Sequence, residues 1–121
     1  MALRLEGKVA LVTGSGSGLG EATAKRFAQM GAHVYVTDVN IAGLERVVDE
    51  IKQAGGGATG REQNVTIEAD WDVLMTEIIQ SHGQLDILVN NAGIALTGNV
   101  EEVTLDDWRK TQAVNLDAVF M

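Results

Sequence analysis

Four glycines crowd into one short stretch, and their spacing is the first feature of this sequence that suggests chemistry. They are Gly14, Gly16, Gly18 and Gly20, and they directly follow an aliphatic and β-branched run, Val9–Thr13. A strand that ends in a glycine-rich turn and opens a helix lets backbone N–H groups and the positive helix end approach a pyrophosphate. A glycine cluster alone is equally compatible with a flexible turn, so the surrounding elements must decide between the two interpretations.

An acidic residue follows this turn at an informative distance. Asp38 ends a second apolar run, and its separation from the glycines is close to the roughly 20 residues at which an acidic side chain accepts hydrogen bonds from the adenosine ribose of a dinucleotide. Its charge would repel a 2′-phosphate, which favours NAD over NADP. The structural alternative is that Asp38 is an N-cap beside Asn40.

A parallel α/β sheet is needed to bring the glycine turn and Asp38 together, and the hydrophobic pattern predicts one. Short apolar runs indicate strands, and apolar residues at helical spacing between them indicate helices. This alternation implies a parallel sheet of about four strands, in the order 3-2-1-4, with helices on both faces. Strands are expected over 9–13, 34–37, within 58–63 and over 85–89, and helices over 21–30, from Asn40 to the glycines at 55–57, over 67–81 and from Thr104 to Met121.

The third and fourth strands differ in character. The third contains Gly60, Arg61 and Glu62, which have poor strand propensity, and an edge position would explain their presence. The fourth, 85–89, is densely apolar, which predicts burial on both of its faces.

The composition indicates one globular domain and excludes several classes of function. The chain has 121 residues, 45% of them hydrophobic and 21% charged, so a single domain over 1–121 is expected. The formal net charge of -8 would repel nucleic acid, and the absence of cysteine excludes disulfides and thiolate metal sites. There is neither a signal peptide pattern nor an apolar run of about 18 residues, so we expect no membrane association and a cytosolic location.

The exact spacing of the glycines carries a resemblance to a known family. The pattern is Gly14-x-x-x-Gly18-x-Gly20 after Thr13, with Leu19 where G-x-G-x-x-G would place its third glycine. It resembles the cofactor loop of the short-chain dehydrogenase/reductase family, as do Asn90-Asn91-Ala92-Gly93 after the fourth strand and Val114-Asn115-Leu116 in the last helix. The resemblance covers the whole chain in order. It implies the N-terminal half of a Rossmann-type oxidoreductase that uses NAD to interconvert secondary alcohols and ketones.

The resemblance also implies which residues form the site. Asn64-Val65 stands where the family often has Asp-Val to hold the adenine, and Ser15 and Ser17 stand where relatives that prefer NADP tend to carry a basic residue. Asn115 matches the family's catalytic asparagine, which supports a water or lysine relay. The cofactor-binding residues implied are Gly14, Ser17, Gly18, Leu19, Gly20, Asp38, Asn64, Val65, Asn91, Ala92 and Gly93, and no metal ligand is expected.

The rest of the family's catalytic set has no counterpart in this sequence. The family uses a serine and a Tyr-x-x-x-Lys pair, whereas the only tyrosine here is Tyr35, an expected packing residue of the second strand. His33 and His82 precede strands, so they are expected on the surface at the amino ends of the strands, away from the ligand edge. The chain is therefore expected to bind NAD without turnover on its own.

Two other interpretations remain open from the sequence. The chain could be a shortened form of an intact dehydrogenase, or a non-enzymatic module that binds NAD or a partner. An end within the last helix favours the fragment or shortened form over such a module. Because the family pairs further strands beyond the fourth, we expect an exposed apolar edge at 85–89 and either self-association or a partner there.

Overall fold

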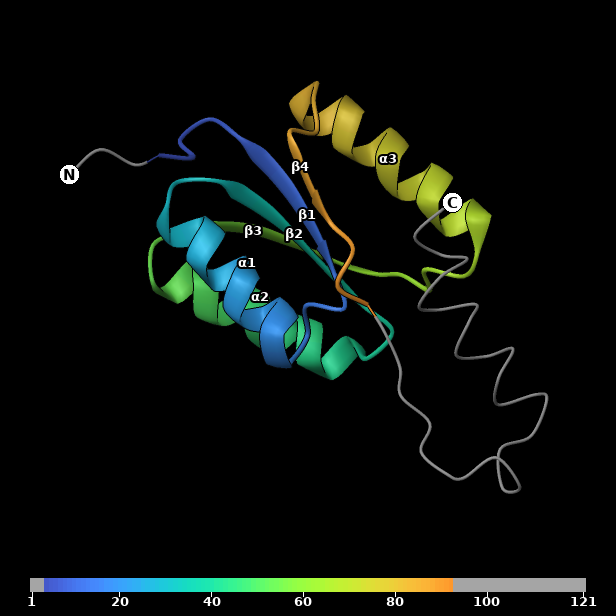
Figure 1. The fold of residues 1–121 in the computed structure, drawn as a ribbon, viewed down its shortest axis with the longest axis horizontal. Helices are drawn as coiled ribbons and strands as arrows, with labels where there is room; N and C mark the ends of the chain where they lie inside the picture. Colours follow the sequence, from blue (N-terminus) through green and yellow to red (C-terminus); the bar gives the residue numbers. More distant parts are fainter. Residues whose placement is uncertain (1–3, 93–121) are drawn as a thin grey trace, which may run out of the picture.

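The computed structural model describes residues 4–92 and contains a parallel sheet in the order β3-β2-β1-β4. Helices α1 and α2 cover one face of the sheet and α3 covers the other (Figure 1). The predicted α/β class and strand order are confirmed. The expected helix 104–121 lies outside the described residues, as do Gly93 and Asn115. The elements are β1 (Val9–Thr13), α1 (Gly18–Gln29), β2 (His33–Asp38), α2 (Ile41–Gln53), β3 (Gly57–Glu62), α3 (Glu68–His82) and β4 (Ile87–Val89).

The register of the sheet aligns the carboxyl ends of its strands. Thr13, the last residue of β1, pairs with Thr37, and Val12 pairs with Val89 at the end of β4. Because parallel strands all run in the same direction, the segments that leave β1, β2 and β4 emerge at one edge of the sheet. That edge is where the glycine turn, Asp38 and the Asn-Asn-Ala segment must meet.

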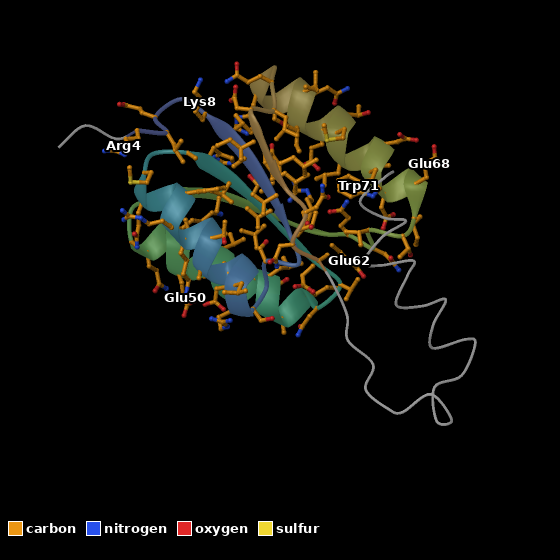
Figure 2. The ribbon with its side chains drawn as sticks, viewed as in Figure 1. Arg4, Lys8, Glu50, Glu62, Glu68 and Trp71 are labelled. Atoms are coloured by element: carbon orange, nitrogen blue, oxygen red, sulfur yellow. The ribbon has the colours of Figure 1, made fainter. Side chains whose placement is uncertain are left out.

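The core is divided between the two faces of the sheet. On the first face, alternate residues of β1 and β2 pack against small residues of α1 and aliphatic residues of α2. On the second face, Trp71, Leu74 and Ile78 of α3 pack against the opposite residues of the same strands, and Trp71 lies between α3 and the sheet (Figure 2). The first cluster consists of Ala10, Val12, Ala24, Ala28, Ala32, Val34, Val36, Leu44, Val47, Val48, Ile51 and Ala58.

Strand β3 forms at the edge of the described sheet in spite of its poor propensity. It pairs in parallel with β2 over its full length. A side chain at Gly60 would come within 2.8 Å of Leu44 Cδ1 on α2, so the glycine lets the helix pack closely on the strand. The predicted edge position is confirmed.

Strand β4 departs from its prediction. It is shorter than expected, and Leu88 is 47% exposed while its neighbours Ile87 and Val89 are half-buried, so burial on both faces was wrong. Within residues 4–92, β4 pairs only with β1, and therefore one of its edges and part of one face lack cover. No helix in this part of the chain is long and apolar enough to cross a membrane.

Candidate dinucleotide-binding site

The glycine turn is a tight connection between β1 and α1 that glycine alone fits without strain. Gly14 and Gly18 have φ values of +62° and +59°, in the left-handed region that side chains disfavour. A Cβ on Gly14 would also lie 2.8 Å from Ala92 Cα, whereas beside Gly18 there is open space. Gly14 is therefore required both by its φ and by its packing against Ala92. Gly18 is required by its φ, and its lack of a side chain leaves the loop surface beside it open.

The first turn of α1 explains the third glycine of the pattern. A Cβ on Gly20 would overlap Gly14 O and lie 2.5 Å from Asn91 Nδ2, so only glycine lets the helix approach the end of β1. Leu19 is 81% exposed and points away from this contact. The first intrahelical N–H is that of Glu21, which donates to Ser17 O at 3.1 Å. The amides of Gly18, Leu19 and Gly20 therefore have no partner within the helix and face the edge of the sheet.

The two serines of the loop have opposite environments. Ser15 is fully buried: its Oγ donates to Val12 O at 2.6 Å and accepts from Thr37 N at 3.1 Å, which fixes the loop to β1 and β2. Ser17 is exposed at the N-cap of α1 and makes no side-chain capping bond. Only Ser17 can therefore face a ligand.

Asp38 braces the loop and does not cap α2. Its Oδ2 accepts from Gly16 N at 3.0 Å and its Oδ1 accepts from Asn40 N at 3.0 Å. The N-cap is Asn40, whose Oδ1 accepts from Gly43 N at 3.1 Å. Each oxygen of the half-buried carboxylate therefore retains acceptor capacity for a further donor.

Thr13 joins the Asn-Asn-Ala segment to the glycine loop. Its Oγ1 accepts from both Asn91 N and Ala92 N at 3.0 Å and donates to Val89 O at 3.3 Å. The side chain of Asn91 completes the junction, because its Nδ2 donates to Gly14 O at 3.2 Å. Thr13 was not among the predicted site residues. The signal was available, since it opens the Thr-Gly-x-x-x-Gly-x-Gly motif.

Asn64 and Val65 lie in the turn between β3 and α3. Asn64 Oδ1 accepts from Thr66 N at 3.0 Å and from Thr66 Oγ1 at 2.6 Å, so this oxygen already has two donors. Val65 is buried, and its carbonyl accepts from Trp71 Nε1 at 2.9 Å. The geometry gives Asn64 and Val65 local structural roles, and their contact with an adenine stays a prediction.

Gln63 connects this turn to Asp38. Its backbone N donates to Asp38 O at 3.1 Å, and its buried side chain accepts from Thr37 Oγ1 at 2.8 Å. The Nε2 atom of Gln63 has no partner among the described residues. The end of β3 is therefore held directly against the end of β2.

Four charged residues surround the first turn of α1. Glu21 pairs with Arg46 at 2.6 Å and with Lys25 at 2.6 Å, and Glu50 pairs with both of these bases. Hydrogen bonds from Arg46, and then from Lys25, lower the pKa of Glu21 to about 2. Arg46 also reaches the loop, since its Nη2 lies 3.3 Å from Gly16 O.

The histidines lie at the opposite end of the sheet, as predicted, but His33 is not a simple surface residue. It is half-buried, its Nε2 lies 2.8 Å from Thr59 Oγ1, and its ring lies against that of His82, with centroids 4.4 Å apart and planes tilted by 37°. Burial, followed by the charges of His82 and Lys52, lowers the pKa of His33. Tyr35 is buried in the sheet beside both rings, as expected of a packing residue.

A hollow of about 640 Å³ also lies away from the glycine turn. It opens between the C-terminal ends of α1 and α2, where Ala28, Ile51 and Gly56 line it. None of the predicted cofactor-binding residues within 4–92 lines this hollow. The site at the carboxyl edge of the sheet is instead an open surface formed by loop backbone.

The residues at this edge fit a dinucleotide. Glycines leave the backbone of the loop and helix end open to an anion, while Asp38 places an acceptor beside the loop. Among the predicted residues, the structure brings together Gly14, Gly18, Gly20, Asp38, Asn91 and Ala92, with Ser17 and Leu19 exposed beside them. It places Asn64 and Val65 at the neighbouring end of β3.

Comparison with known proteins agrees with this arrangement. The profile of a family described as short chain dehydrogenase matches residues 8–121. This chain belongs to the short-chain dehydrogenase family. The cofactor of this family is NAD or NADP, and a matched structure of a metagenomic short-chain oxidoreductase was solved in complex with NADP, with 34% identity and a TM-score of 0.90 over 97% of this chain and 53% of that one.

Other known proteins are similar over nearly the whole chain. A 2,5-dichloro-2,5-cyclohexadiene-1,4-diol dehydrogenase of Sphingobium indicum is 46% identical over 100% of this chain and 48% of its own length. A cyclohexanol dehydrogenase of Acinetobacter is 39% identical over 99% of this chain and 48% of its own. A short-chain dehydrogenase/reductase structure from Burkholderia xenovorans has a TM-score of 0.92 at 37% identity, with 97% and 48% covered. The chain thus spans about half the length of these relatives, roughly their N-terminal half.

Proposed function

We propose that this chain binds NAD(H) and forms the cofactor-binding part of a cytosolic oxidoreductase that interconverts a secondary alcohol and a ketone. The observation that carries this proposal is the meeting of three segments at one edge of the sheet: the glycine loop, Asp38, and the Asn91-Ala92 turn tied to the loop through Thr13. The similar proteins named for cyclohexanol and for a cyclohexadiene diol support a secondary alcohol as the substrate class.

The proposed preference for NAD rests on Asp38. Its two oxygens each accept one backbone N–H, which leaves acceptor capacity for the two hydroxyls of a ribose. A 2′-phosphate on this ribose would lie next to the Asp38 carboxylate. Two like charges about 4 Å apart repel each other by about 1–4 kcal/mol near a protein surface. The NADP found in one similar structure makes this preference a matter for direct measurement.

The chain's own residues would bind and orient the cofactor. NAD, when bound, supplies the hydride acceptor for oxidation of the alcohol. The loop backbone and the first turn of α1 would hold its pyrophosphate, and Asp38 would hold the adenosine ribose. Tyr35, the only tyrosine, is buried in the sheet, so we propose that residues 1–121 alone bind the cofactor without turning over substrate.

The test is a titration of the full chain with NADH, followed by fluorescence. Gly18→Ala should weaken NADH binding about tenfold or more, because a methyl group on the open surface blocks one charge-assisted hydrogen bond, worth about 1.5–3 kcal/mol. Gly7→Ala is the matched control, since Gly7 also has a positive φ of +79° and open space around it. This control should bind NADH as the wild type does and should lose similar stability.

A wild-type chain that shows no saturable NADH or NADPH binding would contradict the proposal. Equal loss of affinity in the Gly18 and Gly7 variants would show that backbone strain, and not the site, was being measured. Binding of NADH in a longer chain that shows no alcohol oxidation would favour a non-enzymatic module.

A further inference from the structure

Arg46 on α2 contacts the glycine loop and α1 at the same time. Its Nη2 donates to Glu21 Oε1 at 2.6 Å and to Gly16 O at 3.3 Å, while its Nη1 donates to Glu21 Oε2 at 3.1 Å and to Glu50 Oε2 at 2.9 Å. The guanidinium group therefore forms a bidentate pair with a residue in the first turn of α1, and the same nitrogen reaches the loop that precedes this turn.

Gly16 is held at both of its backbone groups. Its N–H donates to Asp38 and its carbonyl accepts from Arg46. Neither side of this residue has free space, because a Cβ on Gly16 would lie 2.9 Å from Asp38 Oδ2 and one on Gly43 would lie 2.8 Å from Gly16 O. The loop is thus pressed against the start of α2, and two side chains of opposite charge fix the orientation of one residue in it.

We propose that Arg46 is a positioning residue for the dinucleotide site, which holds the glycine loop through Gly16 O and the first turn of α1 through Glu21. This inference rests on the proposed NAD-binding function. The arrangement requires an arginine, because its planar fork satisfies a carboxylate and a carbonyl together, whereas a lysine ammonium is a single point charge on a flexible stem.

The competing explanation is that Arg46 only joins α1 to α2. The Arg46 side chain is 48% exposed, and exposed ion pairs contribute little to stability. Glu50 separates the two explanations. Glu50→Gln removes the ion pairs of Glu50 with Arg46 and Lys25, but it leaves the contacts of Arg46 with Gly16 and Glu21 intact.

The experiment compares NADH affinity and thermal stability of the full chain in three variants. Arg46→Met should weaken NADH binding about tenfold or more, in line with the loss of a hydrogen bond from a charged donor. Arg46→Lys should bind NADH as weakly as Arg46→Met while recovering part of the melting temperature. Glu50→Gln should lower the melting temperature only slightly and keep NADH affinity within about twofold of the wild type.

A second readout needs no ligand. Hydrogen exchange of the backbone amides at 16–20 should be faster in both Arg46 variants than in the wild type or in Glu50→Gln. If the wild type bound no NADH, the proposed function would fail, and these exchange rates would still decide the role of Arg46. Unchanged loop exchange in Arg46→Met, or full recovery of affinity in Arg46→Lys, would overturn the inference.

Discussion

At the scale of single residues, Asp38 has two tasks that a mutation would disturb together. Its oxygens hold the backbone N–H groups of Gly16 and Asn40, and the same oxygens are the proposed acceptors for the ribose. Truncation to alanine would remove the loop brace and the ribose acceptor at once. Asparagine keeps the shape of the side chain and removes its charge, and its one oxygen can still accept from Gly16 N, so only the bond from Asn40 N is lost.

Asp38→Asn should therefore raise the ratio of NADPH to NADH affinity by about tenfold, since removal of one like charge near a surface relieves about 1–4 kcal/mol of repulsion. Affinities for both nucleotides, measured by calorimetry on the full chain, give the ratio directly.

Asp86→Asn is the matched control for this prediction. Asp86 Oδ2 also accepts from a backbone N–H, that of Val9, at 2.8 Å, but at the opposite end of the sheet. An unchanged nucleotide ratio in Asp38→Asn, or an equal rise in the Asp86 variant, would refute the role of the Asp38 charge in cofactor choice.

At the scale of elements, the strands and helices were easier to predict than the contacts between them. The sequence located β1 to the residue and β3 at an edge, because both depend on local pattern. The hydrophobic pattern predicted a start of α1 at Glu21. The helix starts at Gly18, because Gly18 and Gly20 belong to its first turn. Gly16 in the loop is bonded to Asp38 of β2 and Arg46 of α2. Such contacts between elements cannot be predicted from the residue spacing within one element.

The site showed the same division. The motif placed Gly14, Gly18 and Gly20 correctly at the turn, but it did not indicate that Ser15 would be buried or that Thr13 would tie the loop to Asn91. The Thr13 hydroxyl bonds to three backbone groups that are far from it in the sequence, so this role becomes visible only in the folded structure.

The ion pairs between α1 and α2 predict a specific dependence on acid. Arg46 and Lys25 lower the pKa of Glu21 from 4.5 to about 2, so Glu21 stabilises the fold above pH 4.5 and this contribution is lost as the pH falls from 4.5 toward 2. Because its partners Arg46 and Lys25 are 48% and 33% exposed, solvent screens these pairs, and the contribution is about 1 kcal/mol. Glu21→Gln should lower the free energy of unfolding at pH 6 by this amount.

Urea unfolding at pH 6 and at pH 3 measures this effect. The difference between wild type and Glu21→Gln should shrink at pH 3. Glu45→Gln, on the exposed face of α2, should leave stability nearly unchanged at both values. A gap that stays constant or widens on acidification would mean that Glu21 does not contribute through its charge.

At the scale of the whole molecule, the described fold has an uneven surface. The carboxyl edge of the sheet is polar and ordered by hydrogen bonds, whereas Leu88 on β4 is 47% exposed. Residues 4–92 provide β4 with one neighbour, β1, and a strand edge with unpaired backbone groups is a template for another strand. We propose that this edge pairs with another strand, either from a second copy of the chain or from a partner.

Where a second copy pairs at this edge, Leu88→Lys should shift the chain from dimer toward monomer, since a charged side chain on an edge strand opposes pairing. Sedimentation velocity at micromolar concentrations measures the distribution. Val73→Lys is the control, because Val73 is 69% exposed on α3 and does not belong to the strand. A wild-type chain that sediments as a monomer throughout would exclude self-association at β4.

The contrast between Ser15 and Ser17 has a consequence for protein engineering. A designer who wishes to convert the site to NADP would consider placing a basic side chain in the loop at either position. Position 15 is closed to this, because its hydroxyl is enclosed between β1 and β2 and a long side chain would separate the loop from the sheet. Position 17 faces solvent at the start of a helix, so it can accept a long cation without repacking, and redesign should begin there.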